Sequence, residues 1–460
     1  MKPRPERSYP RLAAAVVALL LAGCGGGSGA TPASRSASAP SAPVRPTPRL
    51  TDPRPCPDAT GFTCATLRVP LDRTGRGPGA LALRVATAGP VDAPRTLVYL
   101  TGGPGQPGVP FGPRVRARLR SLLGVYRLVV LDQRGTGRGA LKCPRLQRET
   151  GTSDLTVPSR AAVADCARRL GARRGFFSTA DTVDDLEDLR RALGARKLAL
   201  DGVSYGTFVA ERYAIAHPRR VDRLVLDSVV PAAGLTGLED DGMRRTAQVL
   251  PRSAADLAAV VRRDGDGPEL FDTVVALSVG APSFPGVAAS LRRARAGDRA
   301  PLRRLVRGVH AAQAAPTELF SAGLHAATLC ADLRAPWGRA DAPMRSRPPA
   351  VKRAAARVDP GPFDRATVAG NGLIRLCELW PVTRRRAVSE SRPPGTLPPV
   401  PALLLAGDRD LSTPIAWPRE QLAHTPGGRL LVARAAGHSV QSRAREARVS
   451  RAVIAFLRDR

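Results

Sequence analysis

The chain has 460 residues, of which 43% are hydrophobic and 24% are charged, so it is neither a wholly disordered protein nor a protein of many membrane spans. Its 71 Lys and Arg residues against 39 Asp and Glu give a formal net charge of +32, which would usually suggest a nucleic-acid partner. We expect no such partner, because nearly all of these basic residues are arginines scattered through Ala-, Gly- and Pro-rich sequence, as in proteins from GC-rich genomes.

The N-terminus has the pattern of a secretory signal peptide. Basic residues up to Arg11 precede an apolar run at 12–21, which leads into Leu-Ala-Gly-Cys ending at Cys24. The run is about half the roughly twenty residues that a helix needs to span a bilayer. Leu-Ala-Gly-Cys also resembles the bacterial lipobox, so we expect 1–24 to be a lipoprotein signal peptide that directs export and leaves a lipid on Cys24. The alternative is an ordinary cleaved signal with an incidental cysteine.

Residues 25–55 are mostly Gly, Ser, Ala, Thr and Pro, and they carry too few apolar side chains to support a core. We expect them to form a flexible tether between the lipid and a folded domain. The protein would then lie outside the cytoplasm and contact the membrane only through its N-terminal lipid.

Six cysteines follow the tether, and export would allow them to form disulfides. They are Cys56, Cys64, Cys143, Cys166, Cys330 and Cys377. Six cysteines allow fifteen pairings, which sequence alone does not separate, although their order along the chain suggests pairing between neighbours. The chain has no Cys-x-x-Cys, no His-Glu-x-x-His and no cluster of His and Cys at ligand spacing, so we expect neither a metal nor another cofactor.

After the tether, short apolar runs bounded by turn residues alternate with helical patterns, which is typical of a mostly parallel sheet with crossover helices. We expect strands at 67–71, 81–87, 96–100, 126–131, 197–201, 221–226, 402–405 and 430–433. A helix is expected at 182–193, because Val183, Leu186 and Leu189 recur at helical spacing and Gly194 follows.

Between 231 and 400 the sequence changes to Ala-, Arg- and Leu-rich helical stretches with Pro and Gly breaks. Helices are expected at 254–263, 287–296, 301–312 and 318–331. Because strand-like sequence resumes in 401–460, we predict that 56–230 and 401–460 form one core and that 231–400 is a helical cap inserted before the last two strands. A separate second domain is the competing interpretation. We expect a monomer.

Gly-Val-Ser-Tyr-Gly at 202–206 lies between the expected strand at 197–201 and a helical stretch at 205–217. A nucleophile elbow needs this context, because the serine occupies a sharp turn from strand to helix and the glycines leave room for close backbone approach. The pattern predicts that Ser204 is a catalytic nucleophile.

A serine nucleophile needs a base and an orienting carboxylate. In folds with a nucleophile elbow, both come after the serine in the chain, first the acid and then the histidine. Of five histidines, His217 ends the elbow's helix, His310 and His325 lie in the cap, His424 lies in a helical stretch and His438 lies on the loop after 430–433. A loop position allows an imidazole to reach the elbow, so His438 is the predicted base.

The predicted acid is Asp410, which follows the strand at 402–405. Asp408 lies in the same segment, where a turn-stabilising role is favoured. Asp227, after the strand at 221–226, is a further alternative.

The oxyanion of the tetrahedral intermediate needs backbone donors, and the residue after the nucleophile supplies one, here the amide of Tyr205. The second should come from the loop 101–105, which contains Gly102, Gly103 and Gly105. We predict Gly103 as this donor, with Gly102 as the alternative.

Together these motifs resemble the proline iminopeptidase and tripeptidyl aminopeptidase family of α/β-hydrolase serine peptidases. The matching segments are Gly-Gly-Pro-Gly at 102–105, Asp-Gln-Arg-Gly-Thr-Gly at 132–137, Gly-Val-Ser-Tyr-Gly-Thr at 202–207, Leu-Asp-Ser-Val-Val at 226–230, the segments 377–381 and 407–414, and Gly-His at 437–438. The resemblance runs from about Cys56 to the C-terminus. It implies an α/β-hydrolase fold, the triad Ser204, Asp410 and His438, and disulfides between neighbouring cysteines.

An exopeptidase of this kind needs a carboxylate in its cap to pair with the ammonium group of the substrate's free N-terminus. Asp332 beside Cys330 and Glu378 beside Cys377 are the candidates, because a disulfide between these cysteines would bring the two acids together.

We therefore expect an exported serine hydrolase, an aminopeptidase that releases short N-terminal peptides or residues through an acyl-enzyme. The first alternative is a carboxylesterase, whose substrate would be a small ester or lactone rather than a peptide. It would use the same catalytic residues, so the fold and the triad do not separate the two. The alternative of another class is a lipid-tethered binding protein without turnover.

Overall fold

The computed structural model describes residues 47–75, 77–383 and 395–459. The signal-peptide and lipidation predictions for 1–24 lie outside these ranges. Within them, no helix is both long enough and apolar enough to cross a membrane.

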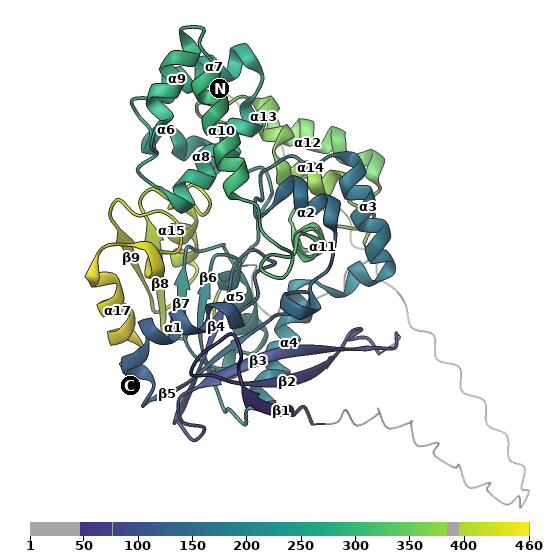
Figure 1. The fold of residues 1–460 in the computed structure, drawn as a ribbon, viewed down its shortest axis with the longest axis vertical. Helices are drawn as coiled ribbons and strands as arrows, with labels where there is room; N and C mark the ends of the chain where they lie inside the picture. Colours follow the sequence, from purple (N-terminus) through teal and green to yellow (C-terminus); the bar gives the residue numbers. More distant parts are fainter. Residues whose placement is uncertain (1–46, 76, 384–394, 460) are drawn as a thin grey trace, which may run out of the picture. The chain divides into compact units, whose positions relative to one another are not determined.

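The described chain forms a nine-stranded sheet in the order β1-β2-β3-β5-β4-β6-β7-β8-β9 (Figure 1). Its strands are β1 (Leu50–Pro55), β2 (Thr63–Pro70), β3 (Ala80–Ala88), β4 (Arg95–Leu100), β5 (Tyr126–Leu131), β6 (Leu198–Val203), β7 (Val221–Asp227), β8 (Ala402–Gly407) and β9 (Gly428–Ala433). The first three strands pair antiparallel, as β3 does with β5, and the strands from β5 to β9 pair in parallel. The prediction of a mostly parallel sheet is confirmed.

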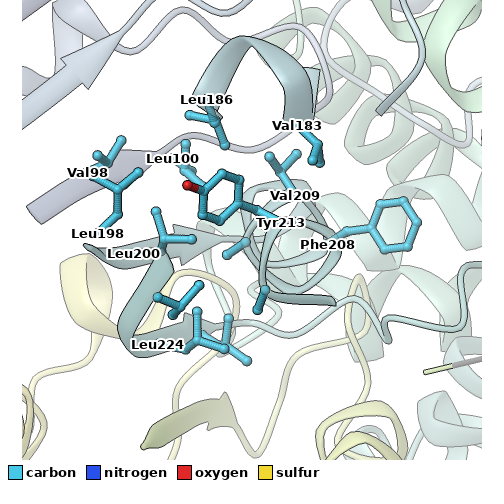
Figure 2. Packing of buried hydrophobic residues seen from close by; sticks show 14 of the residues in the cluster. Val98, Leu100, Val183, Leu186, Leu198, Leu200, Phe208, Val209, Tyr213 and Leu224 are labelled. Atoms are coloured by element: carbon cyan, nitrogen blue, oxygen red, sulfur yellow. The ribbon is translucent and has the colours of Figure 1, made fainter. Parts of the chain in front are cut away.

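Helices cover both faces of the sheet, because alternate strand residues point to opposite sides. On one face, Val98 and Leu100 of β4 pack with side chains of α4 (Thr179–Ala192) and α5 (Tyr205–Ala216) (Figure 2). On the other face, Leu97 and Tyr99 pack with α1 (Gly112–Arg118) and α17 (Ala447–Arg458). Burial on both faces explains why the central strands read as continuous apolar runs rather than alternating ones.

The C-terminal end of the predicted tether is wrong, because residues 50–55 form strand β1. This strand pairs with β2 through an irregular register between Thr51 and Arg54. It carries Pro53 and Pro55, which a strand tolerates at the edge of a sheet, where one side of the backbone needs no partner. These prolines made the segment resemble unstructured chain.

The helices between β7 and β8 are α6 (Asp240–Val249), α7 (Ala254–Asp264), α8 (Gly267–Gly280), α9 (Val287–Arg295), α10 (Ala300–Ala312), α11 (Ala322–Asp332), α12 (Arg347–Ala355), α13 (Arg365–Gly370) and α14 (Gly372–Leu379). Helix α11 begins four residues later than expected, because the Ser321 side chain accepts a hydrogen bond from the Leu324 amide and caps the helix there.

Two helices from the first half of the chain also belong to this layer. Helices α2 (Pro144–Thr150) and α3 (Arg160–Leu170) share one apolar cluster with α11 and α14, and Figure 1 shows them side by side. The prediction that all of 56–230 belongs to the core is therefore wrong for this segment. We call α2, α3 and the helices from α6 to α14 the cap.

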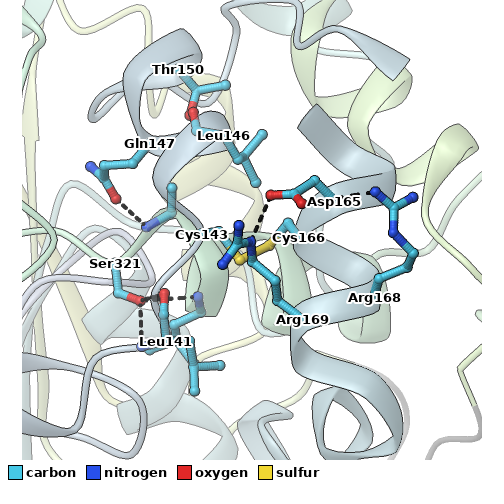
Figure 3. The surroundings of a disulfide bond; sticks show 12 residues. Leu141, Cys143, Leu146, Gln147, Thr150, Asp165, Cys166, Arg168, Arg169 and Ser321 are labelled. Atoms are coloured by element: carbon cyan, nitrogen blue, oxygen red, sulfur yellow. Dashed lines mark hydrogen bonds and ion pairs between the residues drawn. A yellow bond between two sulfur atoms is a disulfide. The ribbon is translucent and has the colours of Figure 1, made fainter. Parts of the chain in front are cut away.

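The six cysteines form the disulfides Cys56–Cys64, Cys143–Cys166 and Cys330–Cys377, which are the neighbouring pairs. The latter two lie within the apolar cluster of the cap. Cys143–Cys166 joins α3 to the start of α2, beside the contact between Ser321 and the backbone of Leu141 (Figure 3).

Helix α5 carries a buried carboxyl group, Glu211, whose side chain is fully buried and whose two oxygens have no hydrogen-bond partner. Burial raises the pKa of Glu211 well above its ordinary value, although the positive charge of Arg212 acts in the opposite direction. The folded protein therefore holds this carboxyl in its protonated form at pH values where the unfolded chain has already lost the proton.

Glu211→Gln removes this difference, so the variant should gain free energy of unfolding relative to wild type as pH rises above the ordinary glutamate pKa. The gain should approach about 1.4 kcal/mol per pH unit until the folded-state pKa is reached. Chemical denaturation between pH 4 and 8 measures it. The exposed Glu420→Gln in α15 (Ala416–Ala423) is the control. Parallel pH profiles for wild type and Glu211→Gln would contradict the assignment of a buried neutral carboxyl.

Candidate active site

Ser204 lies in the turn between β6 and α5. Its backbone φ is 56°, a value that residues other than glycine rarely adopt. Its amide donates to the Asp227 carbonyl at 2.9 Å, and its own carbonyl accepts from the Thr207 amide at 2.8 Å. A side chain at Gly202 would overlap the backbone of Gly206. The glycine spacing in the sequence is therefore a steric requirement of this turn, and the turn raises the serine at the C-terminal edge of the sheet.

His438 and Asp410 form a buried pair, with 2.9 Å between His438 Nδ1 and Asp410 Oδ2. The carboxylate of Asp410 also accepts hydrogen bonds from the amides of Ser412 and Thr413 and from Thr413 Oγ1 at 2.6 Å. Burial acts to raise the pKa of Asp410, but the attraction of His438, its hydrogen bond and the Thr413 donors outweigh burial and lower this pKa. The carboxylate is therefore held charged against the imidazole.

The pKa of His438 is raised in return. Burial alone would lower it, but the charge of Asp410, their hydrogen bond and the nearby charge of Asp227 favour the protonated ring. This is the electrostatic arrangement that a general base needs, since the imidazolium that forms during proton transfer is stabilised.

The two alternative acids have other roles in the structure. Asp227 accepts hydrogen bonds from the amides of Val440 and Gln441, both at 2.8 Å. Asp408 Oδ1 accepts from the Ala436 amide at 3.2 Å. Both carboxylates therefore hold the loop that carries His438, whereas Asp410 contacts the ring itself.

One pocket brings three of the predicted residues together. Ser204, Tyr205 and Gly103 line it, as does Thr413, whose Oγ1 lies 3.3 Å from His438 Nδ1. The loop 101–105 lies against the serine, since a side-chain carbon at Gly102 would lie 2.9 Å from Ser204 Cβ. The pocket therefore joins the serine, both predicted oxyanion residues and a side chain bound to the His438–Asp410 pair.

Of the two predicted amine-binding acids, the structure brings only Asp332 to this pocket. Its Oδ2 accepts a hydrogen bond from the Thr179 amide at 2.7 Å. Glu378 is not among the residues that line the pocket, and its carboxylate forms an ion pair with Arg375 one turn earlier on α14. The disulfide joins their helices, but it does not bring the two acids to one site.

Two further acids, Asp154 and Glu239, line the pocket, and the sequence indicated neither of them. Burial, and after it the negative charges of Asp154, Asp240 and Asp241, raise the pKa of Glu239 to about 8. Neither acid lies near a recognisable motif. Only the fold brings the Asp154 loop, the start of α6 and the end of α11 together, so sequence spacing carried no signal for them.

A family profile described as the alpha/beta hydrolase fold matches residues 95–443, most of the chain. The chain belongs to the α/β-hydrolase fold family. A solved esterase from Thermogutta terrifontis aligns with 85% of this chain and 98% of its own at 18% identity, with a TM-score of 0.39, which is too low to bear on function.

Curated relatives agree with the resemblance drawn from the motifs. A tripeptidyl aminopeptidase from Streptomyces coelicolor is 33% identical over 29% of this α/β-hydrolase and 28% of its own length. Serine protease Hip1 from Mycobacterium tuberculosis is 32% identical over 37% and 36%. A proline iminopeptidase from Neisseria meningitidis is 30% identical over 29% and 32%. The matches therefore span only about a third of each relative's length.

The contact between His438 and Asp410 leads to a testable prediction about the pH dependence of kcat/KM. A general base must be unprotonated, and His438 has a raised pKa, so kcat/KM for any cleaved substrate should rise with pH through a midpoint above 6.5, the ordinary histidine value. In Asp410→Asn the stabilising charge is lost. The midpoint should then fall, and kcat should drop by about 10⁴-fold, as for such changes in other triads. A midpoint that does not move would contradict the assignment of Asp410.

Proposed function

We propose that the protein is a serine aminopeptidase that cleaves peptides near a free N-terminus. The observation that carries this proposal is the set of acidic side chains in the pocket around Ser204. Three carboxyl side chains line it, those of Asp154, Glu239 and Asp332, and none of its described lining residues is Lys or Arg. In a chain with a formal net charge of +32, such a pocket favours a cationic ligand group, and the ammonium of a peptide N-terminus is one.

The proposed chemistry is acyl transfer. Ser204 Oγ attacks the scissile carbonyl while His438 takes its proton, and Asp410 keeps the ring oriented and stabilises its charge. The amides of Gly103 and Tyr205 donate to the oxyanion. His438 then gives the proton to the leaving amine, and a water molecule, deprotonated by the same ring, hydrolyses the acyl-enzyme and restores the serine.

The raised pKa of Glu239 fits this ligand. Burial and the neighbouring negative charges favour its neutral form. An ammonium group beside it would favour the ionised form, so binding would be accompanied by release of a proton. Asp332, held by the Thr179 amide, is positioned as a second acceptor for the same group.

A carboxylesterase is the second candidate, because much of the rest of the pocket wall is apolar. Phe208, Leu329, Leu373 and Trp417 are among its lining side chains. Such a wall also suits the acyl group of a small ester. The two candidates differ in whether the carboxylates contribute to substrate binding.

Matched substrates separate these candidates. We expect wild type to cleave an apolar aminoacyl or peptidyl anilide with a free amine much better than its N-acetyl form, and Ser204→Ala to cleave neither. In Asp332→Asn and Glu239→Gln, KM for the free-amine anilide should rise by about 10-fold, the loss of roughly one partly buried ion pair. Activity on a short-chain aryl ester should not change.

The control variant is Glu318→Gln, which changes an exposed acid of the cap outside the pocket. Cleavage of esters alone by wild type would replace the peptidase proposal with the esterase. Equal cleavage of free and acetylated anilides would contradict recognition of the substrate's ammonium group. Full activity in Ser204→Ala would contradict the assignment of Ser204 as the nucleophile.

We also propose that this peptidase acts outside the cytoplasm as a lipoprotein. The Leu-Ala-Gly-Cys sequence ending at Cys24 supports lipidation, and three disulfides suit an oxidising compartment. The full-length protein expressed in a bacterium with lipoprotein processing should sediment with membranes and partition into detergent. Cys24→Ala should shift it to the soluble exported fraction, while Cys24→Ala protein that stays in the membrane fraction would contradict the anchor.

A further inference from the structure

His325 is a buried histidine of α11 that lies between the acidic pocket and the loop 101–105. The residue is 4% exposed, and the ring of Phe320 packs against it with 5.4 Å between ring centroids. The proposed hydrolysis uses His438, so this second histidine has no part in the proton transfer.

Both ring nitrogens of His325 face acceptor oxygens. Nδ1 lies 2.9 Å from the carbonyl oxygen of Pro104, and Nε2 lies 3.1 Å from Oδ1 of Asp154. The Nδ1 contact is a hydrogen bond when Nδ1 carries a proton, because a carbonyl oxygen only accepts. The Nε2 contact lacks hydrogen-bond geometry, and it is an ion pair when the ring is protonated. The ring thus spans the space between the loop and the acid.

The two ends of this bridge have different functions in the proposed reaction. Pro104 follows Gly103, the predicted oxyanion donor, whereas Asp154 is one of the three acids of the pocket. The same helix holds the loop at a second point, since the Ser321 amide donates to the Gly105 carbonyl at 3.0 Å. The oxyanion loop is therefore fixed by the cap as well as by the core.

We propose that His325 is a positioning residue that fixes the distance between the bound amino terminus and the oxyanion site, and so selects the length of the peptide that is released. A substrate that reaches both ends places its ammonium near Asp154 and its scissile carbonyl at Gly103. Only an acyl group of matching length does both. The amine half of this inference rests on the proposed aminopeptidase function, whereas the loop half requires only hydrolysis at Ser204.

Three substitutions separate the two contacts. The amide nitrogen of Asn lies about where Nδ1 lies in histidine, so His325→Asn keeps a donor toward Pro104. The amide nitrogen of Gln lies about where Nε2 lies, so His325→Gln keeps a donor toward Asp154. His325→Phe fills the space and keeps neither. The control is His424→Gln, at an exposed histidine after α15.

The first measurement is kcat on p-nitrophenyl acetate, which has no amine. His325→Asn should stay near the wild-type value, while His325→Gln and His325→Phe should lose at least about 10-fold in kcat with little change in KM, because a displaced oxyanion donor weakens only the transition state. Equal kcat in all three variants, or equal losses that follow their melting temperatures, would overturn the placement of the loop by His325.

The second measurement is kcat/KM on aminoacyl, dipeptidyl and tripeptidyl anilides with free amines. Wild type should prefer one length, and all three His325 variants should reduce that preference by about 10-fold, since each breaks the bridge at one end or both. An unchanged length preference would overturn the spacing role. If wild type does not distinguish free from acetylated amines, the aminopeptidase proposal fails and with it the length role, while the ester measurement still decides the role of His325 at the loop.

Discussion

The sharp turn at Ser204 is the constraint on which the other groups of the candidate active site depend. A positive φ at a serine is strained, and it persists because the strand before it and the helix after it are both buried. The turn is also held from the neighbouring strand, since the Ser204 amide donates to the Asp227 carbonyl. The position of the hydroxyl is therefore set by the packing of the sheet rather than by a flexible loop.

The same neighbouring strand also controls the histidine. The carboxylate of Asp227 accepts from the amides of Val440 and Gln441, and the Gln441 side chain donates to Asp201 Oδ1 at 2.7 Å, at the end of the elbow strand. Burial raises the pKa of Asp201 to about 6, against the charge of Arg118 and the Gln441 hydrogen bond. Two buried acids thus join the elbow to the loop that presents His438. Neither contacts the ring, and both fix where it lies.

The local parts of this site were predictable from the sequence, and the parts made by tertiary packing were not. Ser204, Asp410 and His438 each follow an apolar strand in a recognisable turn, so strand order alone brought them to one edge. Asp154 lies in the pocket because α2 and α3 pack with α11 and α14, and Glu239 lies there because it is the residue at which α6 begins. No periodicity in the sequence indicated either placement. Glu378 was expected in the same site as Asp332, and for a related reason the structure does not bring it there. The Cys330–Cys377 disulfide brings two helices together, but it does not set the direction of each side chain on them. The Glu378 carboxylate is directed to Arg375, three residues earlier on the same helix.

The proposed function requires that Ser204 react in a pocket that binds an amine. Phosphonate diphenyl esters of an apolar amino acid phosphonylate activated serines, and they can be made with a free or an acetylated amine. We expect both reagents to label Ser204 alone, as measured by intact mass and peptide mapping. We expect the free-amine reagent to label it at least about 10-fold faster, equivalent to about 1.4 kcal/mol. Labelling at another residue, or equal or faster labelling by the acetylated reagent, would contradict this requirement.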